Sequence, residues 1–66
     1  MNIRINEQSR EVPVGATVAD VIESLQLNPK FVAVEVNLEL VPREQHPRHI
    51  LADGDQLEVV TLVGGG

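Results

Sequence analysis

The 66-residue chain holds at most one domain, and its 42% apolar content is sufficient for one compact core. It contains no cysteine, which excludes disulfides, thiolate metal sites and a cysteine nucleophile. Ten acidic residues against five Lys and Arg give a net charge of -5, which argues against nucleic acid and anionic membranes as partners. The same charge suits a well-solvated surface or steering toward a basic protein surface.

The sequence carries no signal for a membrane or for export. Its apolar runs are all shorter than the roughly 20 residues of a membrane-spanning helix. Residues 1–4, Met-Asn-Ile-Arg, do not begin the basic and apolar regions of a signal peptide. We therefore expect a cytoplasmic protein that is monomeric when free.

The N-terminal part of the chain predicts a β-hairpin. Residues 3–5 and 11–14 each alternate apolar and polar side chains, and the polar residues 6–9 between them favour a turn. Pro13 has no N–H to donate, so the second strand is predicted to lie at a sheet edge. The side chains expected to face the core are Ile3, Ile5, Val12 and Val14.

A helix is predicted to begin after Thr17. The Thr17 hydroxyl suits an N-cap, and Asp20 adds negative charge to the first turn in an approximate capping box. An apolar stripe follows at i, i+3, i+4 and i+7: Val18, Val21, Ile22 and Leu25. We expect Asn28 and Pro29 to end the helix, because a residue before proline avoids the helical region.

Three further strands are predicted, at residues 31–36, 40–41 and 56–63. Residues 43–49 are expected to form a loop or a single helical turn, and Gly54 allows a tight turn at residues 53–55. Two groups of side chains are expected in the core: Val32, Val34 and Val36 from one strand face, and Ile50 and Leu51 after the loop.

The order β-β-α-β-β-β predicts an α+β fold. We expect a mixed sheet of four to five strands with one main helix packed on one face. The predicted domain spans residues 1–63, and residues 64–66 form a glycine tail.

An apolar set is predicted on the opposite, solvent-exposed face of the sheet: Phe31, Ala33, Val60 and Leu62. A contiguous apolar patch on a small protein indicates a partner-binding surface. The alternative is that Phe31 covers the end of the helix and that a bulge turns Val60 inward.

Gly64, Gly65 and Gly66 follow the last predicted strand without a linker. Three consecutive glycines favour a flexible segment, which extends roughly 10 Å beyond the strand. Without side chains, this segment can thread a narrow channel in a partner enzyme and deliver the Gly66 carboxylate. The alternative is a frayed end without a function.

The remaining polar residues do not predict an enzyme. His46 and His49 are three residues apart, but no cysteine accompanies them, and zinc normally needs three or four organised ligands. We expect both histidines to be solvated loop residues and no metal to be bound. A Ser-His-Asp arrangement, a dinucleotide fingerprint and a P-loop are all missing from the sequence.

Several stretches resemble the ThiS family, the ubiquitin-like sulfur carrier proteins of thiamine (thiazole) biosynthesis. They are Val41-Pro42-Arg43, the turn at residues 53–55, and the run from Leu57 through Val63 into the three glycines. The N-terminal hairpin and the helix that opens at Thr17 are also similar, so the resemblance covers essentially the whole chain.

This resemblance implies a β-grasp fold and a carrier rather than an enzyme. It implies that an E1-like, ThiF-type adenylyltransferase uses ATP and magnesium to adenylate the Gly66 carboxylate, with Gly65 as the other half of the family's diglycine. Sulfur from a cysteine desulfurase route then produces a thiocarboxylate, and a ThiG-type thiazole synthase accepts the sulfur. No cofactor would be bound by this chain itself.

Three alternatives remain open at this point. The small subunit of molybdopterin synthase uses the same tail chemistry, although those chains usually run longer and carry more aromatic surface. A protein-conjugating modifier is another. A non-covalent β-grasp binding module is the third, and such a module has no need of a terminal glycine run.

Overall fold

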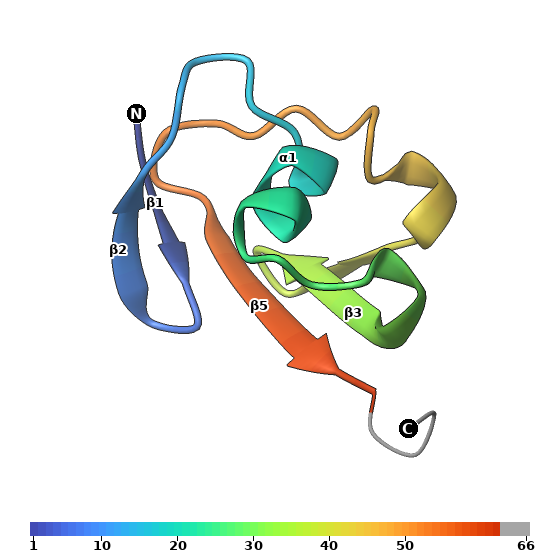
Figure 1. The fold of residues 1–66 in the computed structure, drawn as a ribbon. Coiled ribbons are helices and arrows are strands. Elements are labelled where there is room, and N and C mark those ends of the chain that lie inside the picture. The colour runs from blue at the N-terminus through green and yellow to red at the C-terminus, as the bar shows by residue number, and fades with distance from the viewer. Residues whose placement is uncertain (63–66) are drawn as a thin grey trace.

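The computed structural model describes residues 1–62, and its ribbon is shown in Figure 1. The elements are β1 (Asn2–Ile5), β2 (Gln8–Glu11), α1 (Val18–Ser24), β3 (Val32–Val36), β4 (Glu39–Val41) and β5 (Gln56–Thr61), with short 3-10 turns at Pro29–Phe31 and Arg43–Gln45. None of the helical segments in residues 1–62 has the length and apolar character needed to cross a bilayer.

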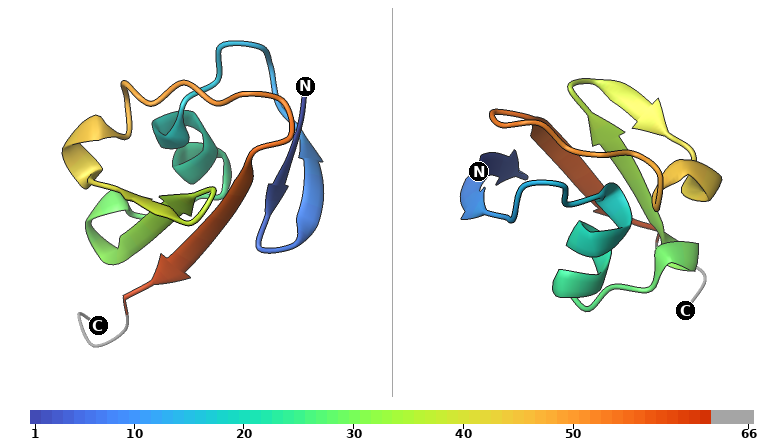
Figure 2. Two further views of the ribbon diagram at one scale, coloured as in Figure 1. Left: turned by 180° about the vertical axis from the view of Figure 1, so that it is seen from behind. Right: turned by 90° about the horizontal axis from the view of Figure 1, so that it is seen from above.

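The strands form one five-stranded mixed sheet in the order β2-β1-β5-β3-β4. Strands β1 and β5 are parallel, while the other neighbouring pairs are antiparallel. Helix α1 lies against one side of this sheet (Figure 2). The predicted α+β architecture, with a mixed sheet and one main helix on one face, is confirmed.

The hydrophobic core lies between helix α1 and the sheet. Alternate residues of each inner strand point inward, and the helix adds its apolar stripe. The buried cluster contains Ile3, Ile5, Val18, Val21, Ile22, Val32, Val34, Val36, Val41, Leu51, Leu57 and Val59. The predicted inward face of Val32, Val34 and Val36 is therefore correct.

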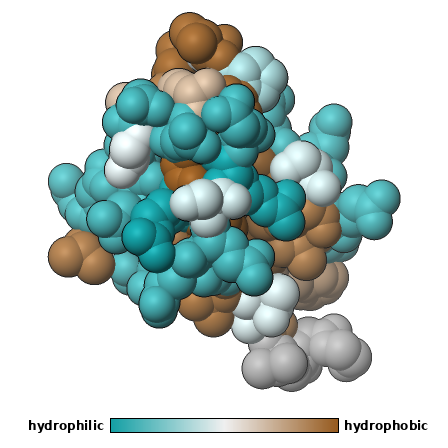
Figure 3. Space-filling model, turned by 90° about the vertical axis from the view of Figure 1, so that its left-hand side faces the viewer, coloured by the Kyte–Doolittle hydropathy of each residue, from teal (hydrophilic) through white to brown (hydrophobic). Residues whose placement is uncertain are grey.

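The N-terminal hairpin is shorter at its turn than the sequence suggests. Asn6 and Glu7 both have positive φ, 49° and 70°, so two residues close the hairpin and β2 begins at Gln8. Strand β2 is the predicted edge strand, but it ends before Pro13, and its four residues are exposed. The surface beside this edge is mostly hydrophilic (Figure 3), which protects the edge from pairing with other chains.

The prediction that Val14 faces the core is therefore wrong. Val14 lies in a turn after β2 and is 88% exposed, whereas Val12 packs partly against the core. The prediction for Ile50 is also wrong, because Ile50 is exposed. Residues 49–51 run extended beside the start of helix α1, so Leu51 points inward while its neighbour Ile50 points outward.

The start of helix α1 is as predicted, but its end is not. Thr17 and Asp20 form a reciprocal capping box. The helix ends at Ser24 rather than at Asn28, because Gln26 adopts a positive φ of 59°. The amide of Gln26 donates to Glu23 O, and that of Leu27 to Ile22 O, in the arrangement of a Schellman motif.

The segment between helix α1 and β3 differs from the expected strand at residue 31. Asn28 caps a 3-10 turn by accepting a hydrogen bond from Lys30 N at 2.9 Å. Phe31 is the last residue of this turn, and β3 begins one residue later than predicted, at Val32.

A histidine belongs to the core as well. His46 is only 3% exposed, which contradicts its prediction as a solvated loop residue. Its Nε2 lies 3.1 Å from Val41 O, and because a carbonyl can only accept, Nε2 carries the hydrogen. The Nδ1 atom is buried without a hydrogen-bond partner among the described residues. His49, in contrast, is only partly buried.

The core packing predicts that two leucine-to-alanine substitutions differ strongly in their effect on the free energy of unfolding. Leu57→Ala should lower the free energy of unfolding by about 2–5 kcal/mol, because it opens a cavity in the centre of the sheet. Leu38→Ala, in the exposed β3–β4 turn, should change it by less than about 0.5 kcal/mol. Urea unfolding of both variants measures this difference. Equal losses of unfolding free energy would show that Leu57 does not contribute to the core more than an exposed leucine does.

Substitution of the two histidines should also have different effects on stability. His46→Ala removes a buried ring and the donor to Val41 O, so we expect a loss of about 1–3 kcal/mol in unfolding free energy. His49→Ala, which removes a partly buried side chain, should cost clearly less. Thermal unfolding of the matched pair tests this, and a His46 variant as stable as the wild type would contradict the assignment.

Candidate functional site

Strand β5 leads the chain from the centre of the sheet toward the glycine run. It lies between β1 and β3, and Figure 1 shows it running along the sheet to the C-terminal end of the described chain. The described part ends at Leu62, so Gly64, Gly65 and Gly66 lie outside it, and their predicted role stays a prediction. The structure does show how the residues just before them are held.

Two sets of hydrogen bonds hold the last part of β5. On the β1 side, Asn6 Nδ2 donates to Val59 O at 3.0 Å, and Val59 N donates to Asn6 Oδ1 at 2.9 Å. On the β3 side, Leu62 N donates to Phe31 O at 2.6 Å. Sequence reasoning placed Asn6 only in a turn. Its contact with a residue 53 positions away depends on the parallel pairing of β1 and β5.

The four residues predicted as a partner-binding surface do lie near one another. Ala33 and Val60 are direct partners in the β3–β5 ladder, and the Leu62 bond to Phe31 O brings the other two into the same region. Phe31, Val60 and Leu62 are 45%, 54% and 52% exposed, and Ala33 is partly buried. We call this set the apolar patch.

The geometry rules out the bulge that would turn Val60 inward. Val60 keeps regular register in β5 and points away from the core, since its neighbour Val59 is buried. The side chains of Ala33 and Val60 therefore lie on the sheet face opposite helix α1. An exposed apolar surface of this kind is typical of a docking site for another protein.

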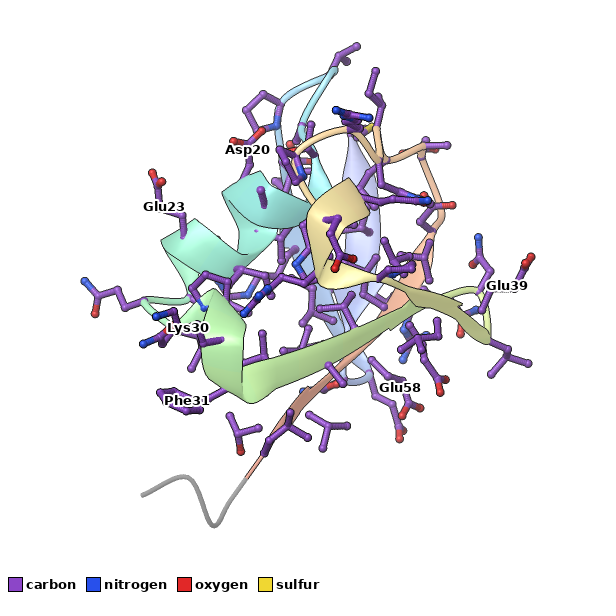
Figure 4. The ribbon with its side chains drawn as sticks, turned by 90° about the vertical axis from the view of Figure 1, so that its right-hand side faces the viewer. Asp20, Glu23, Lys30, Phe31, Glu39 and Glu58 are labelled. Carbon is purple, nitrogen blue, oxygen red and sulfur yellow. The ribbon has the colours of Figure 1, made fainter. Side chains whose placement is uncertain are left out.

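An acidic pair borders the apolar patch. Glu35 and Glu58 are direct cross-strand partners, and both are exposed. Figure 4 shows Phe31 close to the end of β5 and Glu58 further back along the sheet. Like charges placed opposite each other on two strands repel, and a cationic partner would relieve this repulsion. The apolar patch thus has a negatively charged border.

The two histidines, His46 and His49, differ in their surroundings. His46 is fixed in the core by Val41 O, and it also lines a cleft of about 470 Å³ between helix α1 and the Arg43–Gln45 turn. Within residues 1–62, no three His, Cys, Asp or Glu side chains are grouped so as to hold a metal ion.

Comparisons with known proteins agree with the resemblance found in the sequence. The family model of the ThiS family matches residues 3–66. The sulfur carrier protein ThiS of Escherichia coli (strain K12) is 36% identical over 66 residues, which are 100% of both chains. A thiazole synthase of Paramagnetospirillum magneticum is 38% identical over the same 66 residues, but these are only 20% of that longer protein.

The fold also matches a solved structure. The crystal structure of the thiamine biosynthesis protein ThiS from Geobacter metallireducens superposes with a TM-score of 0.84, at 29% identity, and the match covers 100% of both chains. Together with the five-stranded mixed sheet and its single covering helix, this similarity confirms the β-grasp fold. The family model and the full-length relative show that the chain belongs to the ThiS family.

Proposed function

We propose that this chain is a sulfur carrier of thiamine biosynthesis and that the Gly66 carboxylate is the group that carries the sulfur. The observation that supports this most strongly is the family match, which extends through the glycine run to residue 66. The strand that precedes this run is held on both sides, by Asn6 and by Phe31 O. Such a strand suits the presentation of a chain end to an enzyme.

The chemistry follows from the weakness of a carboxylate as an electrophile. A Gly66 carboxylate oxygen attacks the α-phosphorus of ATP, and pyrophosphate leaves, so that an acyl-adenylate forms. A hydrosulfide donor that attacks the acyl carbon displaces AMP and gives the thiocarboxylate directly. A persulfide donor displaces AMP to give an acyl disulfide, and a thiol must then attack that disulfide, which releases the thiocarboxylate and leaves a new disulfide on the donor side. The carrier provides attachment and positioning, while partner enzymes supply the catalysis.

The proposed partners are an E1-like, ThiF-type adenylyltransferase, which binds the ATP and magnesium, and a ThiG-type thiazole synthase, which accepts the sulfur. A cysteine desulfurase route would supply the sulfur. The similarity to a segment of a thiazole synthase supports the second partner. Membership in the ThiS family favours thiamine biosynthesis over molybdopterin synthesis, whose small subunit uses the same tail chemistry.

The docking surface we propose is the apolar patch together with its acidic border. Phe31, Val60 and Leu62 offer exposed apolar area where the described part of the chain ends. Glu35 and Glu58 add negative charge beside it, and the chain as a whole has a net charge of -5. A partner with an apolar pocket and basic rim residues complements this surface, and opposite charge speeds the encounter.

The proposal predicts that the position of the chain end decides activity. An alanine added after Gly66 should leave the thermal unfolding temperature unchanged, because the new residue lies beyond β5, the last strand of the sheet. It should lower thiazole formation at least about 100-fold in an assay with the adenylyltransferase, sulfur donor and thiazole synthase, because no Gly66 carboxylate remains. Thiazole formation at the wild-type rate would rule out the tail chemistry.

The docking surface generates a second prediction. Leu62→Asp should raise the Kd for the adenylyltransferase about tenfold or more, because it places a charge in the apolar contact. Unfolding free energy should change by less than about 0.5 kcal/mol, since Leu62 is half exposed.

Leu38→Asp is the matched control for Leu62→Asp. Leu38 is an exposed leucine in the β3–β4 turn, outside the apolar patch, and its replacement should retain wild-type affinity. Isothermal titration calorimetry measures both affinities. Equal losses in the two variants would assign the effect to net charge alone, and a large loss of stability in Leu62→Asp would show that Leu62 supports the core.

A further inference from the structure

We infer that the side-chain amide of Asn6 is a positioning group that fixes the direction of the end of β5, the strand that leads to the carrier tail. The inference rests on the proposed function, because a tail must be aimed only if it delivers a reacting group. Its physical basis is independent of that function and consists of two hydrogen bonds, from Asn6 Nδ2 to Val59 O and from Val59 N to Asn6 Oδ1.

The amide of Asn6 continues a ladder that the backbone cannot continue. Strand β1 ends at Ile5, and the last backbone bond of its ladder with β5 runs from Asn6 N to Leu57 O at 2.9 Å. Asn6 itself has a φ of 49°, so the chain turns away toward β2. The side chain then replaces the missing strand and binds both the N–H and the C=O of Val59.

Val59 is the last residue of β5 that the structure shows bonded on its β1 side, and it lies three residues before Leu62. On the other side, β5 stays paired with β3 up to Thr61, and Leu62 N reaches Phe31 O. A strand end held from both sides keeps its direction, whereas one held only by β3 can swing about that single ladder. A displacement of about 1 Å at a reacting group can cost about 100-fold in rate.

The chain contains a matched control at the other end of the same strand. Asn37 also has a positive φ, 51°, and its Oδ1 accepts a hydrogen bond from Gln56 N at 3.0 Å, just as Asn6 Oδ1 accepts from Val59 N. Its Nδ2 donates to Asp55 Oδ1 at 2.9 Å. Asn37 thus holds the beginning of β5 by a hydrogen bond, while Asn6 holds the part of β5 that leads to the tail.

The test compares Asn6→Gly with Asn37→Gly. Glycine tolerates positive φ at both positions, so each variant loses the amide and keeps the turn. The first readout is amide hydrogen exchange by NMR, and we expect Val59 to exchange about tenfold faster in Asn6→Gly only. The second is the steady-state rate of sulfur loading by the activating enzyme and a sulfur donor.

We expect Asn6→Gly to lower kcat for sulfur loading about 10- to 100-fold and to leave KM for the carrier near its wild-type value, because the apolar patch is intact. Asn37→Gly should retain both constants. If Asn6→Gly does not fold, Asn6→Asp takes its place. The new carboxylate can still accept from Val59 N but has no hydrogen to donate to Val59 O, so kcat should still fall.

The outcomes separate this inference from the function on which it rests. A wild-type protein that gains no sulfur overturns the proposed function, whatever the variants do. A wild-type protein that is loaded, together with an Asn6→Gly variant that keeps the wild-type kcat, overturns the positioning role. Equal losses of kcat in the Asn6 and Asn37 variants also overturn it, since the effect would then be one of general stability.

Discussion

The pairing of β5 with β1 and β3 is the interaction on which the other features of the molecule depend. Without it, the sheet would separate into the β1–β2 hairpin and the β3–β4 hairpin, and an isolated two-stranded hairpin is at best marginally stable in water. Strand β5 joins them by a parallel ladder on one side and an antiparallel ladder on the other. It also brings Leu57 and Val59 into the core against helix α1.

Alternate side chains of β5 serve different purposes: one set packs in the core and the other lies on the proposed docking surface. Leu57 and Val59 point inward and are buried, whereas Glu58 and Val60 point outward and are exposed. The stability of the domain and the proposed docking surface therefore use different residues of one strand. For this reason a change at Leu62 or Val60 can affect partner binding without a comparable cost to the core.

The sequence predicted the features that depend on strong local patterns. The capping box at Thr17 and Asp20, the inward valines of β3 and the turn at Gly54 are all found where expected. The alternation in β3 and β5 also placed Ala33 and Val60 on one face, and the two residues are direct ladder partners. The resemblance to the ThiS family is confirmed over essentially the whole chain.

Two of the errors arose where residues other than glycine adopt the positive φ that glycine favours. Asn6 and Glu7 close the hairpin in two residues, which moves β2 forward and leaves Val14 outside the core. Gln26 ends the helix early for the same reason. The burial of His46 and the contact of Asn6 with Val59 depend on tertiary neighbours, so no local pattern in the sequence indicates them.

The central claim, that this chain carries sulfur on Gly66, is tested most directly by intact mass spectrometry. The purified protein is incubated with ATP, a ThiF-type adenylyltransferase that is competent on another carrier, and a sulfur donor. We expect a mass increase equal to the exchange of one oxygen for one sulfur, and fragmentation should place it on Gly66. An unchanged mass, or a modification at any other residue, would contradict the claim.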